Sequence, residues 1–409
     1  MTVNDALERE LGKWFDAEAT STPDDLLARS VAHIERTAQR PGILVLDRYP
    51  GRRLPVGVPL FVPAALVLVA VLLATMGLVG GGGRVVTPQP AATTTDGDWN
   101  PQTELAFRAQ FDEADNVPVL KWRAGTYAQY TLSGWEWGDG DRERVAAGEP
   151  MSFLGEGDAA TSSGRRRIEI AISPIGFDAP TVLGPNLIES VDRPVDAITV
   201  SDGGWFTSIE AAEGGGPYTV TALIRVEPGE VGGLTEAGLR AAGTTYSPAV
   251  LGTYLQLPDG AMGPISTKLL ESIRAAVPAG QDPGNPYDLA RAMERYLGGV
   301  ANFTYDDDVR DEVAPRCTDV STVECFAIIK RGYCEYFAST MTVLLRASGV
   351  PARVAYGFLP NARGLDGVEE VGGWLAHWWV EVFFPGVGWV EFDPTGGAVG
   401  QPQLLPPGP

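Results

Sequence analysis

Three chemically useful residue types are scarce in this chain of 409 residues, which has four lysines, three cysteines and two histidines. Three cysteines are too few for a disulfide scaffold and fit no cysteine-rich zinc spacing. His33 and His377 alone cannot build a histidine-rich metal site, so we expect neither a bound metal nor a cofactor. The net charge of −21 repels phosphate backbones and argues against nucleic acid as a partner.

Charged residues are missing altogether between Arg53 and Arg84. Within this gap, Leu60–Val79 is a run of twenty residues that only one proline, one threonine and one glycine interrupt. An α-helix of that length spans about 30 Å, the thickness of the hydrocarbon core of a bilayer. The pattern predicts a transmembrane helix within residues 54–83. A cleaved signal peptide fits less well, because more than fifty residues precede the run.

The flanking charges predict the orientation of this helix. Four arginines lie in the twenty residues before the run, whereas Arg84 is the only one in the twenty after it. Because positive residues stay on the inner side, we expect residues 1–53 in the cytoplasm and residues 84–409 outside it. The predicted localisation is therefore the cell membrane, with a single pass. Residues 1–53 read as two short helices that either dock a partner or pack on themselves or the membrane.

The remainder of the chain divides by pattern. We predict a flexible stalk over residues 84–98, a β-rich extracytoplasmic domain over 99–257, a second domain over 258–398 and a tail over 399–409. In the β-rich part, Ile168, Ile170 and Ile172 alternate with smaller or more polar residues, as in an antiparallel sheet with one buried face. Five aromatic residues crowd one stretch and suit either the β-core or a carbohydrate-binding platform: Trp122, Tyr127, Tyr130, Trp135 and Trp137. In the second domain, Asn285-Pro286 predicts the beginning of a helix.

The cysteines suggest one bridge and one free thiol. Cys317 and Cys325 are eight residues apart in a segment rich in turn-forming residues. Outside the cytoplasm such a pair can oxidise, and closing this loop stabilises the fold by roughly 2–3 kcal/mol in the chain-entropy model. Cys334 is then the odd cysteine, either an inert buried thiol or a reactive one.

Cys334 stands where a helix is expected to begin. Gly332-Tyr333 signals a turn, and Glu335 to Ser348 reads as helical. The positive end of a helix dipole favours the thiolate, so the position predicts a lowered pKa for Cys334. A thiolate is a nucleophile that needs a base and a group to orient that base.

The extracytoplasmic histidine lies in a predicted hairpin. Residues 376–384 read as a strand, residues 385–388 as a turn and residues 389–395 as the returning strand. If the turn centres on Gly386, Asp393 lies opposite Trp379 and on the same face as His377. Diagonal neighbours in such a pair have Cβ atoms within about 7–8 Å, so a His377–Asp393 hydrogen bond is within reach. A slip of one residue would break it.

Together these segments resemble one family. The stretches GYCEYFAS (332–339), LLRASGVPARV (344–354) and HWWVEVFFPGVGWVEFDPT (377–395) resemble the core of the transglutaminase-like superfamily. The likeness covers about residues 284–396 and is greatest to bacterial membrane-anchored members whose catalytic domain lies outside the cytoplasm. It implies a papain-like α+β fold in which Cys334 is the nucleophile, His377 the base and acid, and Asp393 the residue that orients the imidazole.

The resemblance also implies a function. The thiol would transfer an acyl group from glutamine or another amide to an amine or to water, which includes cysteine peptidase or deamidase activity. Trp378 stands where the family usually has a small residue, so it would contact substrate and narrow the acyl site. The expected partners are extracytoplasmic proteins or peptides and the membrane. A transglutaminase-like module that binds a surface or serves as a scaffold without catalysis is the alternative, and the sequence leaves the oligomeric state open.

Overall fold

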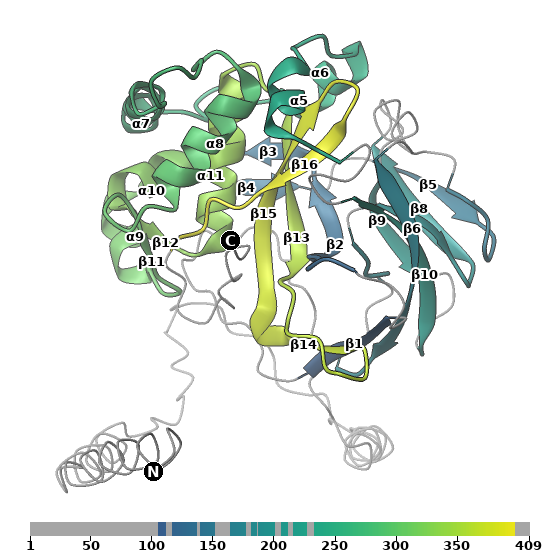
Figure 1. The fold of residues 1–409 in the computed structure, drawn as a ribbon. Coiled ribbons are helices and arrows are strands. Elements are labelled where there is room, and N and C mark those ends of the chain that lie inside the picture. Colours follow the sequence, from purple (N-terminus) through teal and green to yellow (C-terminus); the bar gives the residue numbers. More distant parts are fainter. Residues whose placement is uncertain are drawn as a thin grey trace, which may run out of the picture. The chain divides into compact units, whose positions relative to one another are not determined.

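The computed structural model describes residues 105–396, apart from the segments 112–116, 137–139, 152–163, 177–180, 186, 201–205, 212–215 and 227–232 (Figure 1). The predicted cytoplasmic helices (1–53), membrane helix (54–83), stalk (84–98) and tail (399–409) lie outside the described residues. Among the helices that the structure does describe, none combines the length and the apolar character needed to cross a bilayer.

A seven-stranded antiparallel sheet carries the central part of the fold. Its order is β16 (Gly388–Phe392), β15 (Ala376–Phe384), β13 (Ala352–Phe358), β2 (Trp122–Tyr127), β9 (Phe206–Ala211), β8 (Val195–Val200) and β5 (Gly140–Val145). A five-stranded sheet has the order β14 (Val368–Gly372), β1 (Leu105–Phe111), β6 (Arg165–Pro174), β10 (Tyr218–Arg225) and β7 (Ile188–Val191). Two short pairs complete the strands: β3 (Gln129–Thr131) with β4 (Gly134–Glu136), and β11 (Thr304–Tyr305) with β12 (Arg331–Gly332).

Both large sheets combine strands from the two sides of the expected boundary between residues 257 and 258. Strand β2 pairs with β13, and β1 pairs with β14. Gly357 shows how close the first pairing is, because a Cβ there would lie 1.8 Å from the carbonyl oxygen of Trp122. The β-rich part and the part with the resemblance are therefore hydrogen-bonded into the same sheets.

The period-two prediction is confirmed in the five-stranded sheet. Ile168, Ile170 and Ile172 of β6 are all at most 2% exposed, and the residues between them face away from the core. The aromatic cluster is also settled for four of its members, because Trp122, Tyr127, Tyr130 and Trp135 are at most 1% exposed. These rings form core, which confirms the β-core reading for these four residues over the carbohydrate platform, while Trp137 lies outside the described residues.

The helices pack beside the large sheet (Figure 1). They are α5 (Glu236–Ala241), α6 (Pro248–Tyr254), α7 (Pro264–Ala275), α8 (Pro286–Leu297), α9 (Arg310–Arg316), α10 (Thr322–Ile329) and α11 (Cys334–Ala347), with a 3-10 turn η1 (Gly373–Leu375) before β15. Asn285 caps α8 as predicted, since its side chain accepts a hydrogen bond from the N–H of Tyr287 at 3.0 Å. Helix α11 is almost entirely buried and packs on β15, β13, α8 and α10.

One buried ion cluster fastens three neighbouring strands of the large sheet. Glu381 of β15 is fully buried and lies 2.7 Å from the Arg353 guanidinium of β13 and 3.2 Å from that of Arg123 of β2. Burial raises the pKa of Glu381, but the two guanidinium groups outweigh it and the pKa lies below its usual value. A buried charge of this kind depends on its partners, because it has no water to replace them.

We predict that Glu381→Gln destabilises the fold by about 3–5 kcal/mol, since the change leaves two buried guanidinium groups without their anion. The matched control is Glu370→Gln, because Glu370 pairs with Arg108 at 2.8 Å on the exposed surface. Loss of this exposed ion pair should lower the free energy of unfolding by no more than about 1 kcal/mol. Urea unfolding followed by tryptophan fluorescence measures both variants, and equal midpoints would contradict the prediction.

Candidate active site

Cys334 is the first residue of α11, and the backbone geometry before it explains why the helix begins there. Lys330 adopts a positive φ of 57°, Arg331–Gly332 pairs with β11, and Tyr333 is extended. Gly332 has no room for a side chain, because a Cβ would lie 2.9 Å from the ring of Tyr336. The turn delivers the Cys334 thiol into the protein, where it is free of any disulfide and 0% exposed.

The predicted low pKa of Cys334 is wrong. Complete burial raises the pKa of the thiol well above its usual range, and the nearby carboxylates of Glu335 and Asp393 raise it further. The backbone N–H groups of Trp378 and Glu335 act in the opposite direction but do not compensate. The helix dipole stabilises the thiolate by only about 0.3–1 kcal/mol, whereas burying an ion costs several kcal/mol. Burial therefore favours the neutral thiol over the thiolate.

His377 and Asp393 lie at the same end of the β15–β16 hairpin. His377 Nε2 is 2.9 Å from Asp393 Oδ2, and the imidazole is only 3% exposed. The predicted register is confirmed: Val380 pairs with Phe392, so the next position sets Asp393 opposite Trp379. Because the backbone N–H of Trp378 reaches the Cys334 sulfur, the thiol lies beside the residue that follows His377. The structure thus joins His377 to Asp393 by a hydrogen bond and sets Cys334 beside the strand that carries His377.

Asp393 is held as an anion. Burial raises its pKa, but the charges of His377 and Lys121 and their hydrogen bonds outweigh burial and place the pKa well below its usual range. Oδ1 accepts a hydrogen bond from the Thr395 N–H at 3.1 Å. The backbone N–H of Asp393 donates to Glu294 Oε1 at 2.9 Å, which fixes the residue to α8.

Lys121, which immediately precedes β2, is a member of this site that the sequence analysis did not find. Its Nζ lies 3.5 Å from Asp393 Oδ2 and 3.8 Å from Glu391 Oε2. Burial lowers the pKa of Lys121, yet the carboxylates of Asp393, Glu391 and Glu294 raise it more, so the amine is charged. The one available signal was rarity, because Lys121 is one of four lysines in the chain.

Tyr305 of β11 is a second residue that was missed. Burial raises the pKa of its hydroxyl, as does the charge of Cys334 in its ionised form, whereas the backbone N–H of Cys334 lowers it. The hydroxyl thus lies next to the N–H at the start of α11.

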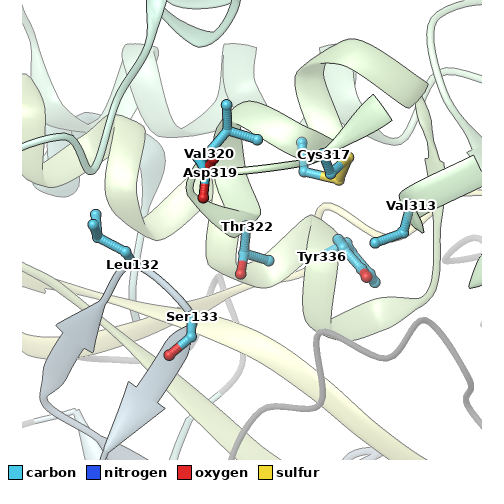
Figure 2. A pocket seen from close by; sticks show the side chains of 9 residues that line it. Leu132, Ser133, Val313, Cys317, Asp319, Val320, Thr322 and Tyr336 are labelled. Carbon is cyan, nitrogen blue, oxygen red and sulfur yellow. A yellow bond between two sulfur atoms is a disulfide. The ribbon is translucent and has the colours of Figure 1, made fainter. Parts of the chain in front are cut away.

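Cys317 and Cys325 form a disulfide with a Cα–Cα distance of 5.1 Å, which ties the end of α9 to α10. The bridge contributes to the wall of a pocket of about 490 Å³ (Figure 2). Figure 2 shows Val313 and Tyr336 beside the disulfide, and Leu132 and Ser133 from the β3–β4 turn across from them. The sequence held no signal for this pocket, because its walls come from segments almost 200 residues apart.

The side chain of Trp378 is packed rather than open to solvent. It is 2% exposed and stacks on Tyr127 at a ring distance of 5.2 Å, with Tyr356 nearby at 6.1 Å. Its backbone, as noted, faces the Cys334 sulfur. The predicted contact of Trp378 with a substrate stays a prediction. Over the residues with described positions, no three side chains of the metal-binding types gather into a site.

We predict that Cys334 remains a neutral thiol up to about pH 9 in the folded chain, above the value of about 8.5 for a free cysteine. The pKa of Cys334 is raised because burial favours the uncharged thiol. Thiolate absorbance at 240 nm, taken as the difference between the chain and Cys334→Ala, measures this. Unfolding in urea should return the transition to its ordinary range. A thiolate signal below pH 8 in the folded chain would contradict the prediction.

Comparison with known proteins finds a family model that matches the part of the chain that carries Cys334, His377 and Asp393. Residues 275–394 match the model of the transglutaminase-like superfamily. The chain is 30% identical over 316 residues to the uncharacterized protein YebA of Bacillus subtilis, an alignment that covers 71% of this chain and 40% of YebA. It is 35% identical over 88 residues to a protein-glutamine gamma-glutamyltransferase of Pseudomonas aeruginosa, covering 20% of this chain and 12% of that protein. The chain thus spans less than half the length of either relative.

A solved structure is also similar. The periplasmic domain of TgpA from Pseudomonas aeruginosa has 21% sequence identity to this chain and a TM-score of 0.47. The superposition covers 72% of this chain and 88% of that domain.

Proposed function

We propose that this chain, which matches the transglutaminase-like superfamily model over residues 275–394, is a cysteine enzyme of that superfamily. It would transfer acyl groups from glutamine or other amides to an amine or to water. The observation that carries the proposal is the 2.9 Å contact between His377 and Asp393 beside a buried, unbridged Cys334 at a helix start. Nucleophile, base and orienting carboxylate are the parts that thiol acyl transfer needs.

The first step begins from a neutral thiol. With Nε2 engaged by Asp393, the other ring nitrogen of His377 is the one left to take the proton from Cys334. The sulfur then attacks the amide carbon, and negative charge develops on the carbonyl oxygen. The backbone N–H of Cys334 is the donor we assign to that oxygen.

The second step releases the amine. His377 returns the proton to the departing nitrogen, ammonia leaves when the donor is a glutamine carboxamide, and an acyl-thioester remains on Cys334. An amine or a water molecule then attacks the thioester and gives its proton to His377. The carbon–sulfur bond breaks, and His377 returns the proton to the Cys334 sulfur. Crosslinking and hydrolysis share this intermediate, so both belong to the proposal.

The same proposal covers location. Leu60–Val79 supplies the length and apolar character of a membrane anchor, and the arginines before it favour a cytoplasmic N-terminus. The catalytic part would then act on proteins or peptides outside the cytoplasm. The non-catalytic alternative, a surface-binding or scaffolding module, fits less well, because such a module would not need the His377–Asp393 contact.

We predict that Cys334→Ala abolishes activity in the full chain. The assay combines a glutamine-containing protein with a labelled amine and measures both amine incorporation and ammonia release. Incorporation with ammonia identifies transfer, and ammonia alone identifies hydrolysis. The matched control is Asp308→Asn, an exposed change that should leave both signals intact. Equal signals from the chain and Cys334→Ala, or no signal with any amide donor, would favour the non-catalytic module.

We also predict that protease added to intact spheroplasts expressing the chain removes residues 84–409 and spares a membrane-bound fragment with residues 1–53. The reason is the cation bias around the apolar run. Antibodies against each end, with and without detergent, read the result. A chain that is protected throughout, or that is recovered without the membrane, would contradict the anchor.

A further inference from the structure

Asp393 Oδ2 is shared by the imidazole of His377 and the ammonium group of Lys121. His377 Nε2 approaches it at 2.9 Å and Lys121 Nζ at 3.5 Å. The Lys121 side chain is 15% exposed and lies over the Trp379 ring, 5.4 Å from its centre, so packing fixes its position. Lys121 precedes β2, outside residues 275–394 that match the family model, yet it touches the carboxylate that orients the imidazole.

From this geometry we propose that Lys121 is a positioning residue of the active site, which anchors Asp393 and shares its charge with His377, so that the carboxylate holds the imidazole in the orientation for proton transfer. The inference rests on the proposed function, because it assigns Lys121 a part in the same proton transfer. Lys121 touches no reacting atom and acts through Asp393.

The electrostatic reason starts from the number of carboxylates. Glu391 lies 3.8 Å from Lys121, and Glu294 accepts the backbone N–H of Asp393, so three carboxyl groups converge. Burial raises the pKa of Glu391 and of Glu294, so Asp393 is the member that stays ionised most firmly. The other charges that act on this group are Arg291 on Glu294, and Glu381, Arg123 and Arg225 on Glu391.

Sharing the carboxylate has a defined effect on the imidazole. If His377 were the sole cation at Asp393, the ion pair would stabilise the protonated ring, and a protonated ring cannot accept the thiol proton. Lys121 places a second positive charge near the same oxygen, so removing Lys121 should favour the protonated ring.

The expected consequence of Lys121→Met is a shift of the acid limb of kcat/KM to higher pH, by about one unit, the size expected for losing a close charge. The rate at a pH below the limb should fall about tenfold, while the rate on the plateau changes far less. Lys121→Arg keeps a cation and should leave the limb near its original position. A purely structural role for Lys121 would lower the rate at every pH and leave the limb in place.

A readout without activity separates this inference from the proposed function. The chain has two histidines, so a His33→Gln background leaves His377 alone, and NMR of its labelled ring follows its titration in the full chain. We expect Lys121→Met to move the midpoint of the His377 titration to higher pH. Lys121→Arg should move the midpoint by less than about half as much. The matched control is Lys268→Met, an exposed lysine of α7.

The outcomes are distinct. A raised midpoint in Lys121→Met, with Lys121→Arg near the original value, supports the inference even if no acyl-transfer activity is found. An unchanged or lowered midpoint in a folded Lys121→Met chain overturns it, whatever the activity. Urea midpoints establish that each variant folds, and Lys121→Gln replaces Lys121→Met should the apolar side chain prevent folding.

Discussion

Exclusion of water from the ionisable groups is the constraint on which this structure depends. Cys334, His377 and Glu381 are all at most 3% exposed, so each charge among them needs a partner inside the protein. Glu381 has two guanidinium groups, and Asp393 has an imidazole and an ammonium. The burial that requires these pairs also strengthens them, because a low dielectric increases the energy of each close electrostatic interaction.

The pairing requirement ties the site to a segment that lies far away in the sequence. Lys121 reaches Asp393, and Arg123, two residues later, reaches Glu381. Lys121 immediately precedes β2 and Arg123 belongs to it, and β2 lies against β13 in the large sheet. The part that matches the family model and the preceding β-rich part are therefore joined by backbone hydrogen bonds and by charge. Residues 275–394 alone would lack a strand and two cations of the observed arrangement.

How much of this could be predicted depends on the range of the interaction. Local signals were sufficient for the alternation in β6, the Asn285 cap and the β15–β16 register, because each is decided within a few residues. Lys121 could not be predicted, since 272 positions separate it from Asp393 and no periodicity links them. The pocket beside the disulfide was missed for the same reason: the β3–β4 turn meets α9 and α10 only in the folded chain.

The Cys334 thiol shows why a correct local argument can predict the wrong direction for a pKa shift. The helix start does favour the thiolate, and the N–H groups around the sulfur act as expected. Burial is the larger effect, and the sequence cannot say how deeply the first residue of a helix lies. A thiol that stays neutral until the substrate carbonyl is bound avoids the desolvation cost of a buried ion pair in the resting protein. In the proposed reaction, proton transfer from Cys334 to His377 then accompanies the attack of the sulfur on the carbonyl carbon, and Lys121 acts through Asp393 to orient the imidazole that accepts the proton.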